Sequence, residues 1–289
     1  MASSFVRGRT LTDRHPWWSN RSARACFLCY HSVSDHAPPS IAVHPATFEQ
    51  QLETLLRCGY SPGDGAALRS LAAGERPQRP LAFLSFDDGF RDTYEEAFPR
   101  LLAWGFRAMV FVLPPLVDTA GSMHWPELGD LPRRLPAVFR SVDWRGVEAM
   151  AEGGMEIGSH TCHHPRLPTL GDEALRQELL DSRARIVDRL GACDAIAYPY
   201  GVCTPRLAAA ARDAGYRFGF SLPYGAAGVG WQRGSGRLEI PRVAVEDRDG
   251  TRRFRLKVTR TGRGLLLSRI KAVVRTAEAR GRRRDGAYG

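Results

Sequence analysis

Two adjacent carboxylates, Asp87 and Asp88, come directly after an apolar run at 81–86. Two negative charges side by side are costly unless a cation or a proton relieves their repulsion. In parallel α/β sheets the functional groups gather at the carboxyl ends of the strands, so a pair delivered there predicts a cation site or an acid–base site. Taken alone, the pair is equally compatible with a solvated turn formed by Asp88 and Gly89.

Three of the eight histidines of the chain, His160, His163 and His164, follow a short apolar segment at 156–158. Histidines four apart, such as His160 and His164, can direct two ring nitrogens at one ion if the segment makes a helical turn, and His163 then points elsewhere. Two imidazoles, one carboxylate and an open position form the ligand set of a catalytic zinc ion or a related divalent ion. A surface cluster on a loop is the alternative.

A third segment, Tyr198-Pro199-Tyr200-Gly201, follows an apolar run that starts at Ala195. A backbone N–H exposed at such a turn can face a developing oxyanion. Turns of this composition are common, so this segment indicates a functional site only in combination with the aspartate pair and the histidine cluster.

Short apolar runs rich in β-branched and aromatic residues alternate with stretches of helical spacing, and this alternation predicts the elements that position the three segments. We expect seven strands, at 26–30, 81–86, 108–113, 156–158, 195–198, 218–221 and 240–245. We expect five helices, at 47–58, 92–104, 144–152, 172–190 and 205–214, the first with Thr47 as its N-cap.

This order of elements predicts a parallel sheet, and seven strands over roughly 220 residues favour a single barrel-like α/β domain. The proline-rich segment 113–136 is interpreted as an excursion loop. We divide the chain into an N-terminal extension at 1–24, a folded domain at 25–250 and a basic tail at 251–289.

The net positive charge of the chain comes from that tail. The 289 residues include 41 basic and 31 acidic residues, a net charge of +10. Residues 251–289 hold 13 basic and 2 acidic residues, whereas residues 25–250 hold 23 basic and 28 acidic residues. No nucleic-acid partner is therefore expected for the domain itself.

The tail contains a basic amphipathic stretch, 264–284. The pattern predicts contact with an anionic membrane surface, with nucleic-acid contact or a solvated basic end as alternatives. Residues 1–20 lack the apolar stretch of a signal peptide, and no run approaches the ~20 apolar residues of a membrane helix. We therefore expect a cytoplasmic protein, docked peripherally on the inner membrane face.

The six cysteines are scattered through apolar segments, which predicts thiols in a reducing compartment. Cys26 and Cys29 form the only CxxC, inside a strand-like run. We interpret them as small buried residues and not as a zinc ribbon.

Taken together, the three segments resemble the motifs of one family. Ser85-Phe-Asp87-Asp88-Gly89, Ser159-His160-Thr-Cys-His-His164 and Tyr198-Pro-Tyr200-Gly201 are similar, in order and separation, to the motifs of the polysaccharide deacetylases of the NodB-homology type, carbohydrate esterase family four. Tyr30-His31 and Ala197-Tyr-Pro-Tyr-Gly are similar to the branch with the poly-N-acetylglucosamine deacetylases. The resemblance covers roughly 25–247 and implies a distorted (β/α)7 barrel.

The resemblance also implies a role for each motif residue. Asp88, His160 and His164 would bind a divalent metal ion, with zinc expected first and cobalt, nickel or iron as alternatives. A metal lowers the pKa of a bound water from ~15.7 towards ~7. This water would attack the amide carbonyl with Asp87 as base, and the backbone N–H of Tyr200 would help to hold the oxyanion.

The sequence departs from the family pattern at two positions. Ala197 stands where an arginine usually orients the base, and no histidine follows His164, so the late Leu-x-His motif that supplies the general acid is missing. His31 is the expected replacement for the acid, because a barrel brings its first and last strands together and this branch places a histidine there. Arg242 is a candidate for the missing arginine. Without an acid, the chain would be a catalytically silent glycan-binding protein.

The predicted activity is therefore hydrolysis of the N-acetyl group of an acetamido sugar in a polysaccharide or a lipid-linked glycan precursor. Removal of a formyl group from a lipid-linked amino sugar is the nearest variant. Trp125 and Trp231 are candidates for stacking on a sugar ring, with packing as the alternative. Tyr216 is interpreted first as a packing residue and second as a residue near the substrate.

Overall fold

The computed structural model describes residues 25–222 and 236–259. The predicted N-terminal extension, Trp231 and the amphipathic stretch 264–284 lie outside the described residues.

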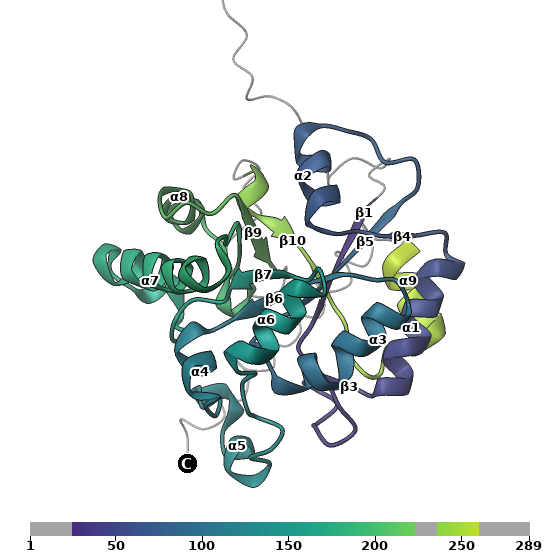
Figure 1. Ribbon diagram of the computed structural model, residues 1–289, viewed down its shortest axis with the longest axis horizontal. Coiled ribbons are helices and arrows are strands. Elements are labelled where there is room, and N and C mark those ends of the chain that lie inside the picture. The colour runs from purple at the N-terminus through teal and green to yellow at the C-terminus, as the bar shows by residue number, and fades with distance from the viewer. Residues whose placement is uncertain (1–24, 223–235, 260–289) are drawn as a thin grey trace, which may run out of the picture.

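The main sheet is parallel throughout and is built from short, mostly buried strands (Figure 1). These are β1 (Ala25–Tyr30), β4 (Ser61–Pro62), β5 (Leu81–Phe86), β6 (Ala108–Val112), β7 (Glu156–Ser159), β8 (Ala195–Ala197), β9 (Phe218–Ser221), β10 (Ile240–Pro241) and β11 (Val243–Ala244). Their order is β10-β9-β8-β7-β6-β5-β1-β11, with β4 paired to β5. A separate pair joins β2 (Ser32–Val33) to β3 (Ala42–Val43).

One chain segment closes the sheet into a barrel. β10 pairs with β9 and β11 pairs with β1, and only Arg242 separates β10 from β11. The strand predicted at 240–245 is therefore split, because its two halves serve opposite edges of the sheet. The seven predicted strands are present in the predicted order, so the (β/α)7 barrel is confirmed.

Helices surround the barrel, with α1 (Pro45–Arg57), α3 (Phe98–Ala103) and α9 (Thr251–Thr259) on one side of the view and α7 (Asp172–Leu190) and α8 (Pro205–Asp213) on the other (Figure 1). The remaining helical elements are α2 (Gly65–Ala73), the π-helical turn η1 (Thr93–Ala97), α4 (Pro114–Thr119), η2 (Pro126–Leu128), α5 (Leu131–Arg134), α6 (Trp144–Glu152), η3 (Leu167–Thr169), η4 (Pro199–Gly201) and η5 (Gly236–Leu238).

The prediction of Thr47 as the N-cap of the first helix was wrong. The helix begins at Pro45, and the Nδ1 atom of His44 accepts a hydrogen bond from the Ala46 N–H at 3.2 Å. Proline at the first helical position has the backbone angle that a helix needs and lacks only an N–H that would go unused. The N-cap of the helix, His44, therefore lies three residues before the predicted cap.

Two layers of apolar side chains flank the strands. Leu28, Leu84 and other residues that face outward pack under the helices, whereas an inner cluster fills the barrel. That inner cluster includes Phe27 and Phe83, whose rings stack with centroids 4.7 Å apart. Successive residues of a strand point to opposite faces, so Phe27 and Phe83 mark the faces of β1 and β5 that point into the barrel.

The segment predicted as an excursion loop, 113–136, contains the short elements α4, η2 and α5. It packs on a small apolar cluster of its own, centred on the buried residues Phe90, Met123 and Phe139. Because this cluster buries apolar side chains from both ends of the segment, the excursion has a fixed place beside the barrel. The expectation of a plain loop was incomplete in this respect.

The folded domain extends past the boundary expected at 250. Helix α9 lies beside α1 (Figure 1), and its side chains Phe254 and Val258 are fully buried in the core. The Tyr60 hydroxyl also donates to the Val258 carbonyl at 2.6 Å. Residues 251–259 therefore belong to the domain and not to the tail.

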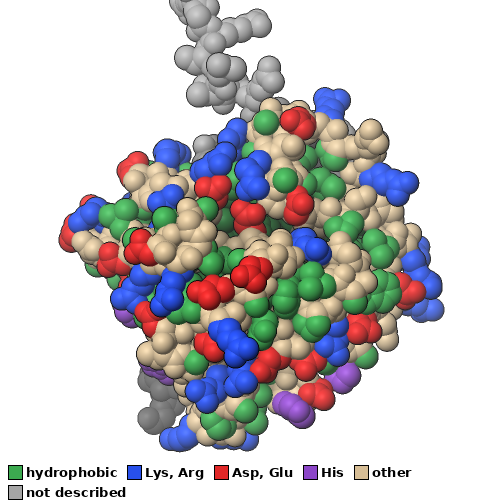
Figure 2. All heavy atoms as spheres, in the orientation of Figure 1, with side chains coloured by type: hydrophobic (Ala, Val, Ile, Leu, Met, Phe, Trp, Pro, Cys, Tyr) green, Lys and Arg blue, Asp and Glu red, His purple; other side chains and the backbone are tan. Residues whose placement is uncertain are grey.

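The six cysteines are all unpaired thiols. Cys26 lies in the outer core and Cys29 faces into the barrel, so the CxxC pair cannot converge on one ion. No helix within 25–222 and 236–259 has the length and apolar character needed to cross a bilayer. On the face drawn in Figure 2, acidic and basic side chains are interspersed without a large patch of one sign.

Candidate active site

Alternation along β5 delivers the first carboxylate into the barrel. Phe83 belongs to the inner cluster, Ser85 is fully buried two residues later, and Asp87 follows at the same parity just past the strand end. The Asp87 backbone N–H donates to the Tyr30 carbonyl at 3.0 Å and so continues the β1–β5 ladder by one residue. Asp88 comes next, where the chain turns with a φ of 72°.

Asp88, His160 and His164 converge, as the resemblance implies, but residues 160–164 form no helical turn, and Thr161 and His164 have positive φ angles instead. The Oδ1 atom of Asp88 lies 3.3 Å from Nε2 of His160 and 3.6 Å from Nε2 of His164. All three side chains are buried. Two strand-end loops, those after β5 and β7, thus present one oxygen and two nitrogens to a single point.

These three residues fit a divalent metal ion. A tetrahedral ion with bonds of about 2.0–2.2 Å places its ligand atoms about 3.3–3.6 Å apart, which matches the two separations above. The Oδ1 atom of Asp88 is buried without a hydrogen-bond donor, an arrangement that is costly unless a cation satisfies it. The Nδ1 atom of His160 lies 2.8 Å from the Ala197 carbonyl, which assigns the proton to Nδ1 and leaves the Nε2 lone pair for an ion.

The protonation states of Asp88 and His164 also favour metal binding. Burial raises the pKa of Asp88, but its contacts with the two imidazoles, first that of His160 and then that of His164, outweigh it, and the net pKa lies below its usual value. Burial lowers the pKa of His164 to about 4. Burial lowers the pKa of His160 as well, although its contact with Asp88 raises the net value. The carboxylate is therefore charged near neutral pH, and His164 is neutral.

Backbone strain is concentrated in the three motifs. Five non-glycine residues in the described ranges have a positive φ, and four of them lie here: Asp88, Thr161, His164 and Tyr200. Each such conformation costs on the order of 1–3 kcal/mol and persists only where the surroundings impose it. The strained backbone turns Asp88 and His164 towards each other.

Asp87 is held by Arg242, which confirms the salt bridge suggested from the sequence. The two guanidinium nitrogens of Arg242 lie 2.6 and 2.7 Å from the two carboxylate oxygens of Asp87, and Arg242 is fully buried. Burial raises the pKa of Asp87, but the charge of Arg242 outweighs it and holds the pKa well below its usual range. Arg242, from the closing segment, therefore orients Asp87, a role that Ala197 cannot fill because its side chain carries no charge.

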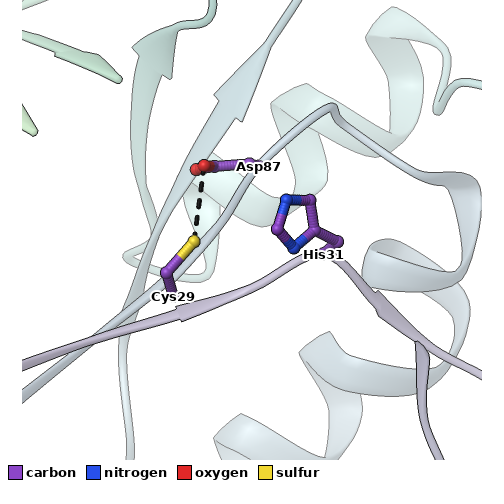
Figure 3. Close-up of side chains that lie close together, drawn as sticks. All are labelled: Cys29, His31 and Asp87. Atoms are coloured by element: carbon purple, nitrogen blue, oxygen red, sulfur yellow. Dashed lines mark hydrogen bonds between the residues drawn. The ribbon is translucent and has the colours of Figure 1, made fainter. Parts of the chain in front are cut away.

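His31 and Cys29 both lie close to Asp87 (Figure 3). A ring nitrogen of His31, the Cys29 sulfur and a carboxylate oxygen of Asp87 all lie within 4.8 Å of one another. The Cys29 thiol donates to Oδ2 of Asp87 at 3.4 Å (Figure 3). This trio does not suit a second metal ion, because Arg242 occupies both oxygens of Asp87 and burial raises the pKa of Cys29 well above its usual value.

A cavity of about 420 Å³ opens beside His164. Trp125 from the excursion stacks on the His164 ring with centroids 4.3 Å apart, and Tyr200 contacts the same ring at 4.6 Å. The Tyr200 hydroxyl donates to Glu127 at 2.7 Å, and Arg166 bonds to Glu127 and lies over the Tyr200 ring. The cavity therefore has an aromatic floor and a charged rim.

Other predicted residues support the loops. His163 points outward, with 72% of its side chain exposed, and its Nδ1 atom lies 2.6 Å from Glu178. The Glu178 carboxylate also accepts the backbone N–H groups of Cys162 and His163. Tyr216 is buried and hydrogen-bonded to Ser182, which in turn contacts Ser159. Its packing role is thus the one that the structure shows.

Sequence reasoning missed four residues of the site: Cys29, Glu127, Arg166 and Glu178. Cys29 has a readable signal, because it shares strand parity with Phe27 and precedes His31 by two residues. The other three are polar residues in helix or loop positions whose meaning depends on contacts across 15 or more residues.

The fold and the site together define a parallel (β/α) barrel protein with a divalent-metal ligand set and a buried carboxylate–arginine pair at the strand ends. A family model described as polysaccharide deacetylase matches residues 74–219, half of the chain. The chain belongs to the polysaccharide deacetylase family, whose members are hydrolases of amide bonds.

Individual proteins agree with this assignment. The protein YxkH of Bacillus subtilis (strain 168) is 26% identical over 232 residues, which cover 78% of this chain and 73% of that protein. Poly-beta-1,6-N-acetyl-D-glucosamine N-deacetylase of Escherichia coli O157:H7 is 27% identical over 157 residues, 53% of this chain, but the match spans only 22% of that enzyme. The structure of the Streptococcus pyogenes deacetylase PplD aligns with a TM-score of 0.64 at 23% identity, covering 79% of this chain and 95% of that chain.

Proposed function

We propose that this chain is a metal-dependent N-deacetylase that removes the acetyl group from an acetamido sugar of a glycan. The observation that carries the proposal is the convergence of Asp88, His160 and His164 next to an Asp87 carboxylate that Arg242 holds in place. A divalent ion bound by Asp88, His160 and His164 would polarise the amide carbonyl and lower the pKa of water. Asp87, His31 and the backbone N–H of Tyr200 are proposed to supply the base, the acid and the oxyanion donor.

Asp87 is the proposed general base. The bidentate contact with Arg242 fixes the plane of the carboxylate. Oδ2 also accepts the Cys29 thiol, so Oδ1 is the oxygen that retains a second lone-pair site for a proton from the attacking water. Arg242 also supplies the charge that keeps Asp87 ionised in a buried position. A base that is already ionised and oriented needs no reorganisation when the reaction starts.

His31 is the proposed general acid, because an amide nitrogen is a poor leaving group until it is protonated. A ring nitrogen of His31 lies within 4.8 Å of the Asp87 carboxylate. The backbone N–H of Tyr200 is the proposed donor to the oxyanion, since the strained turn at 199–201 lies against His164.

An acetylated amino sugar is the proposed substrate. The cavity beside His164 carries Trp125 and Tyr200, whose aromatic faces suit the apolar face of a pyranose. The E. coli relative acts, by its name, on poly-beta-1,6-N-acetyl-D-glucosamine, and this polymer is the first substrate to test. A formyl group would need only a smaller acyl pocket, so formate release is the second reaction to test.

The test is acetate release from N-acetylglucosamine oligomers by purified protein that has been stripped of metal and reloaded with zinc or cobalt. We expect release to depend on the metal and to fall about 10³-fold or more in Asp87→Asn. His163→Ala and His164→Ala form a matched pair of neighbouring histidines, of which only the second should lose metal and activity. Bound metal without acetate or formate release from oligomers or lipid-linked sugars would support a silent glycan-binding protein instead.

The membrane contact predicted for the basic stretch 264–284 stays a prediction, because these residues lie outside the described part of the chain. Co-sedimentation of the full chain with anionic and neutral vesicles tests it directly.

A further inference from the structure

The loop that carries Asp87 and Asp88 also holds the backbone around His31. On the N-terminal side of His31, the Tyr30 carbonyl accepts the Asp87 N–H at 3.0 Å. On the C-terminal side, the carboxylate of Asp92, four residues after Asp88, reaches across to the β2 strand. The backbone of His31 is therefore attached at both ends to the same loop as the proposed base.

The Asp92 carboxylate makes two hydrogen bonds to β2. Its Oδ2 atom accepts the Ser32 hydroxyl at 2.5 Å, and its Oδ1 atom accepts the Val33 N–H at 3.2 Å. Ser32 and Val33 are both fully buried, and they are the two residues that follow His31. The bond to Val33 is to the backbone, so Asp92 fixes the main chain directly after His31.

Asp92 does not serve its own helix. It lies in the first turn of the helix that runs into η1, with helical backbone angles, and its side chain makes no capping bond. Burial raises the pKa of Asp92 to about 7, although the bonds from Ser32 and Val33 act in the opposite direction. Burying an ionised carboxylate at this position destabilises the folded protein, and the bonds that the carboxylate forms are those that hold Ser32 and Val33 of β2.

Within the described residues, the ring of His31 has no side-chain hydrogen bond in the structure, so its backbone attachments decide where it stands. We propose that Asp92 is a positioning residue that fixes His31 relative to the Asp87 carboxylate. The inference rests on the proposed function, in which His31 is the general acid. Asp92 itself touches neither the substrate nor the metal ligands.

The kinetic test uses the full-length, metal-loaded protein. We expect Asp92→Ala to lower kcat about 10- to 100-fold, with KM changed less than about twofold and with unchanged metal content. Asp92→Asn keeps an acceptor for the Val33 N–H and should restore most of the activity; Ser32→Ala should have an intermediate effect. In a His31→Ala background, adding Asp92→Ala should change kcat by less than about twofold, because a residue that acts through His31 has nothing left to position.

Asp64→Ala is the control for a merely structural loss. Asp64 caps α2 by accepting the Ala67 N–H at 2.8 Å and does not contact residues 30–33. We expect it to leave kcat unchanged. The proposal would be overturned if Asp92→Ala lowered kcat by the same factor in the wild-type and the His31→Ala backgrounds. It would also be overturned if Asp92→Asn lost the bound metal.

A second measurement does not depend on activity. The imidazole resonances of the eight histidines can be followed by NMR, with that of His31 assigned by its absence in His31→Ala. We expect Asp92→Ala to shift or broaden the His31 signal and to leave that of the exposed His163 unchanged. An unchanged His31 signal would refute the positioning role, whether or not the wild type releases acetate, and so separates failure of this inference from failure of the proposed function.

Discussion

At the scale of single residues, the ion pair of Asp87 and Arg242 should be the most sensitive to substitution. Both side chains are almost fully buried, and removal of one partner of a buried ion pair costs about 3–5 kcal/mol because the other charge is left without compensation. We expect Arg242→Met to destabilise the protein by about this amount and to lower kcat/KM at least 100-fold. Arg242→Lys should retain the charge but lose the bidentate contact.

Arg217 provides the matched control, because it pairs with Asp194 at 3.0 Å on the surface. Arg217→Met should change the free energy of unfolding by less than about 1 kcal/mol. Urea unfolding and acetate release measure both variants. Full activity in Arg242→Met would show that Asp87 needs no partner.

Asp92 also predicts how stability depends on pH. Burial raises its pKa from 3.8 to about 7 in the folded protein, so the folded state binds this proton more tightly than the unfolded state does. The free energy of unfolding therefore falls as pH rises from about 4 to about 7, by at most about 4 kcal/mol from this group, and no further above pH 7. Asp92→Asn removes this titration.

The expected result is that Asp92→Asn gains stability relative to wild type as pH rises through this window. Urea unfolding of the metal-free proteins between pH 4.5 and pH 8 measures the difference. A difference that stays constant with pH would mean that Asp92 is not the buried acid described here.

The site residues could largely be predicted because strand ends and histidine spacing are local features. Asp87, Asp88 and His160 directly follow predicted strands, and His164 lies four residues after His160. Arg242 could be suggested only because it sits in the last strand, and its contact with Asp87 spans 155 residues. Glu178 could not be found, because a carboxylate in the middle of a long helix gives no sign that it binds backbone groups of a distant loop.

At the scale of elements, the turn that carries Tyr200 depends on Gly201. Gly201 has a φ of 67°, and a Cβ atom added there would lie 2.3 Å from Cβ of Leu222. Gly59 has a similar φ of 82° but open space around it. The two glycines therefore share the cost of the left-handed backbone and differ in the clash.

We expect Gly59→Ala to cost about 1 kcal/mol, the usual cost of a left-handed conformation. Gly201→Ala should cost at least about 2 kcal/mol more and should lower acetate release, because the turn of Tyr200 must shift. Thermal or urea unfolding of both variants isolates the steric part. Equal costs would mean that the turn relaxes without strain.

The long helix could be predicted well, and some of the short helices could not. The long helix predicted at 172–190 has these bounds in the structure. Isolated helices of six to nine residues are marginal without tertiary contacts, and α2 and α4, with nine and six residues, were not predicted, although α6, also with nine, was. Their formation depends on Leu68, Leu71 and Val117, which are buried against distant parts of the chain.

At the scale of the whole molecule, closure of the barrel and construction of the site are the same event. The segment β10–Arg242–β11 joins the two edges of the sheet and at the same point delivers the arginine to Asp87. Helix α9 anchors this segment from behind, since Lys257 donates to the Ala244 carbonyl of β11 at 2.9 Å. The stability of α9 and the geometry of the base are therefore coupled.

Phe254 and Leu256 on α9 test this coupling. Phe254 is fully buried in the core, whereas 54% of Leu256 is exposed. Phe254→Ala should destabilise the protein by about 3–5 kcal/mol through loss of buried surface and formation of a cavity, and Leu256→Ala should stay within about 0.5 kcal/mol of wild type. Because α9 supports the strand that carries Arg242, we also expect Phe254→Ala to lower kcat at temperatures where the protein is still folded. Unfolding curves and acetate release from both variants measure this, and a destabilised Phe254→Ala protein with wild-type kcat would show that the closing strand holds Arg242 without help from α9.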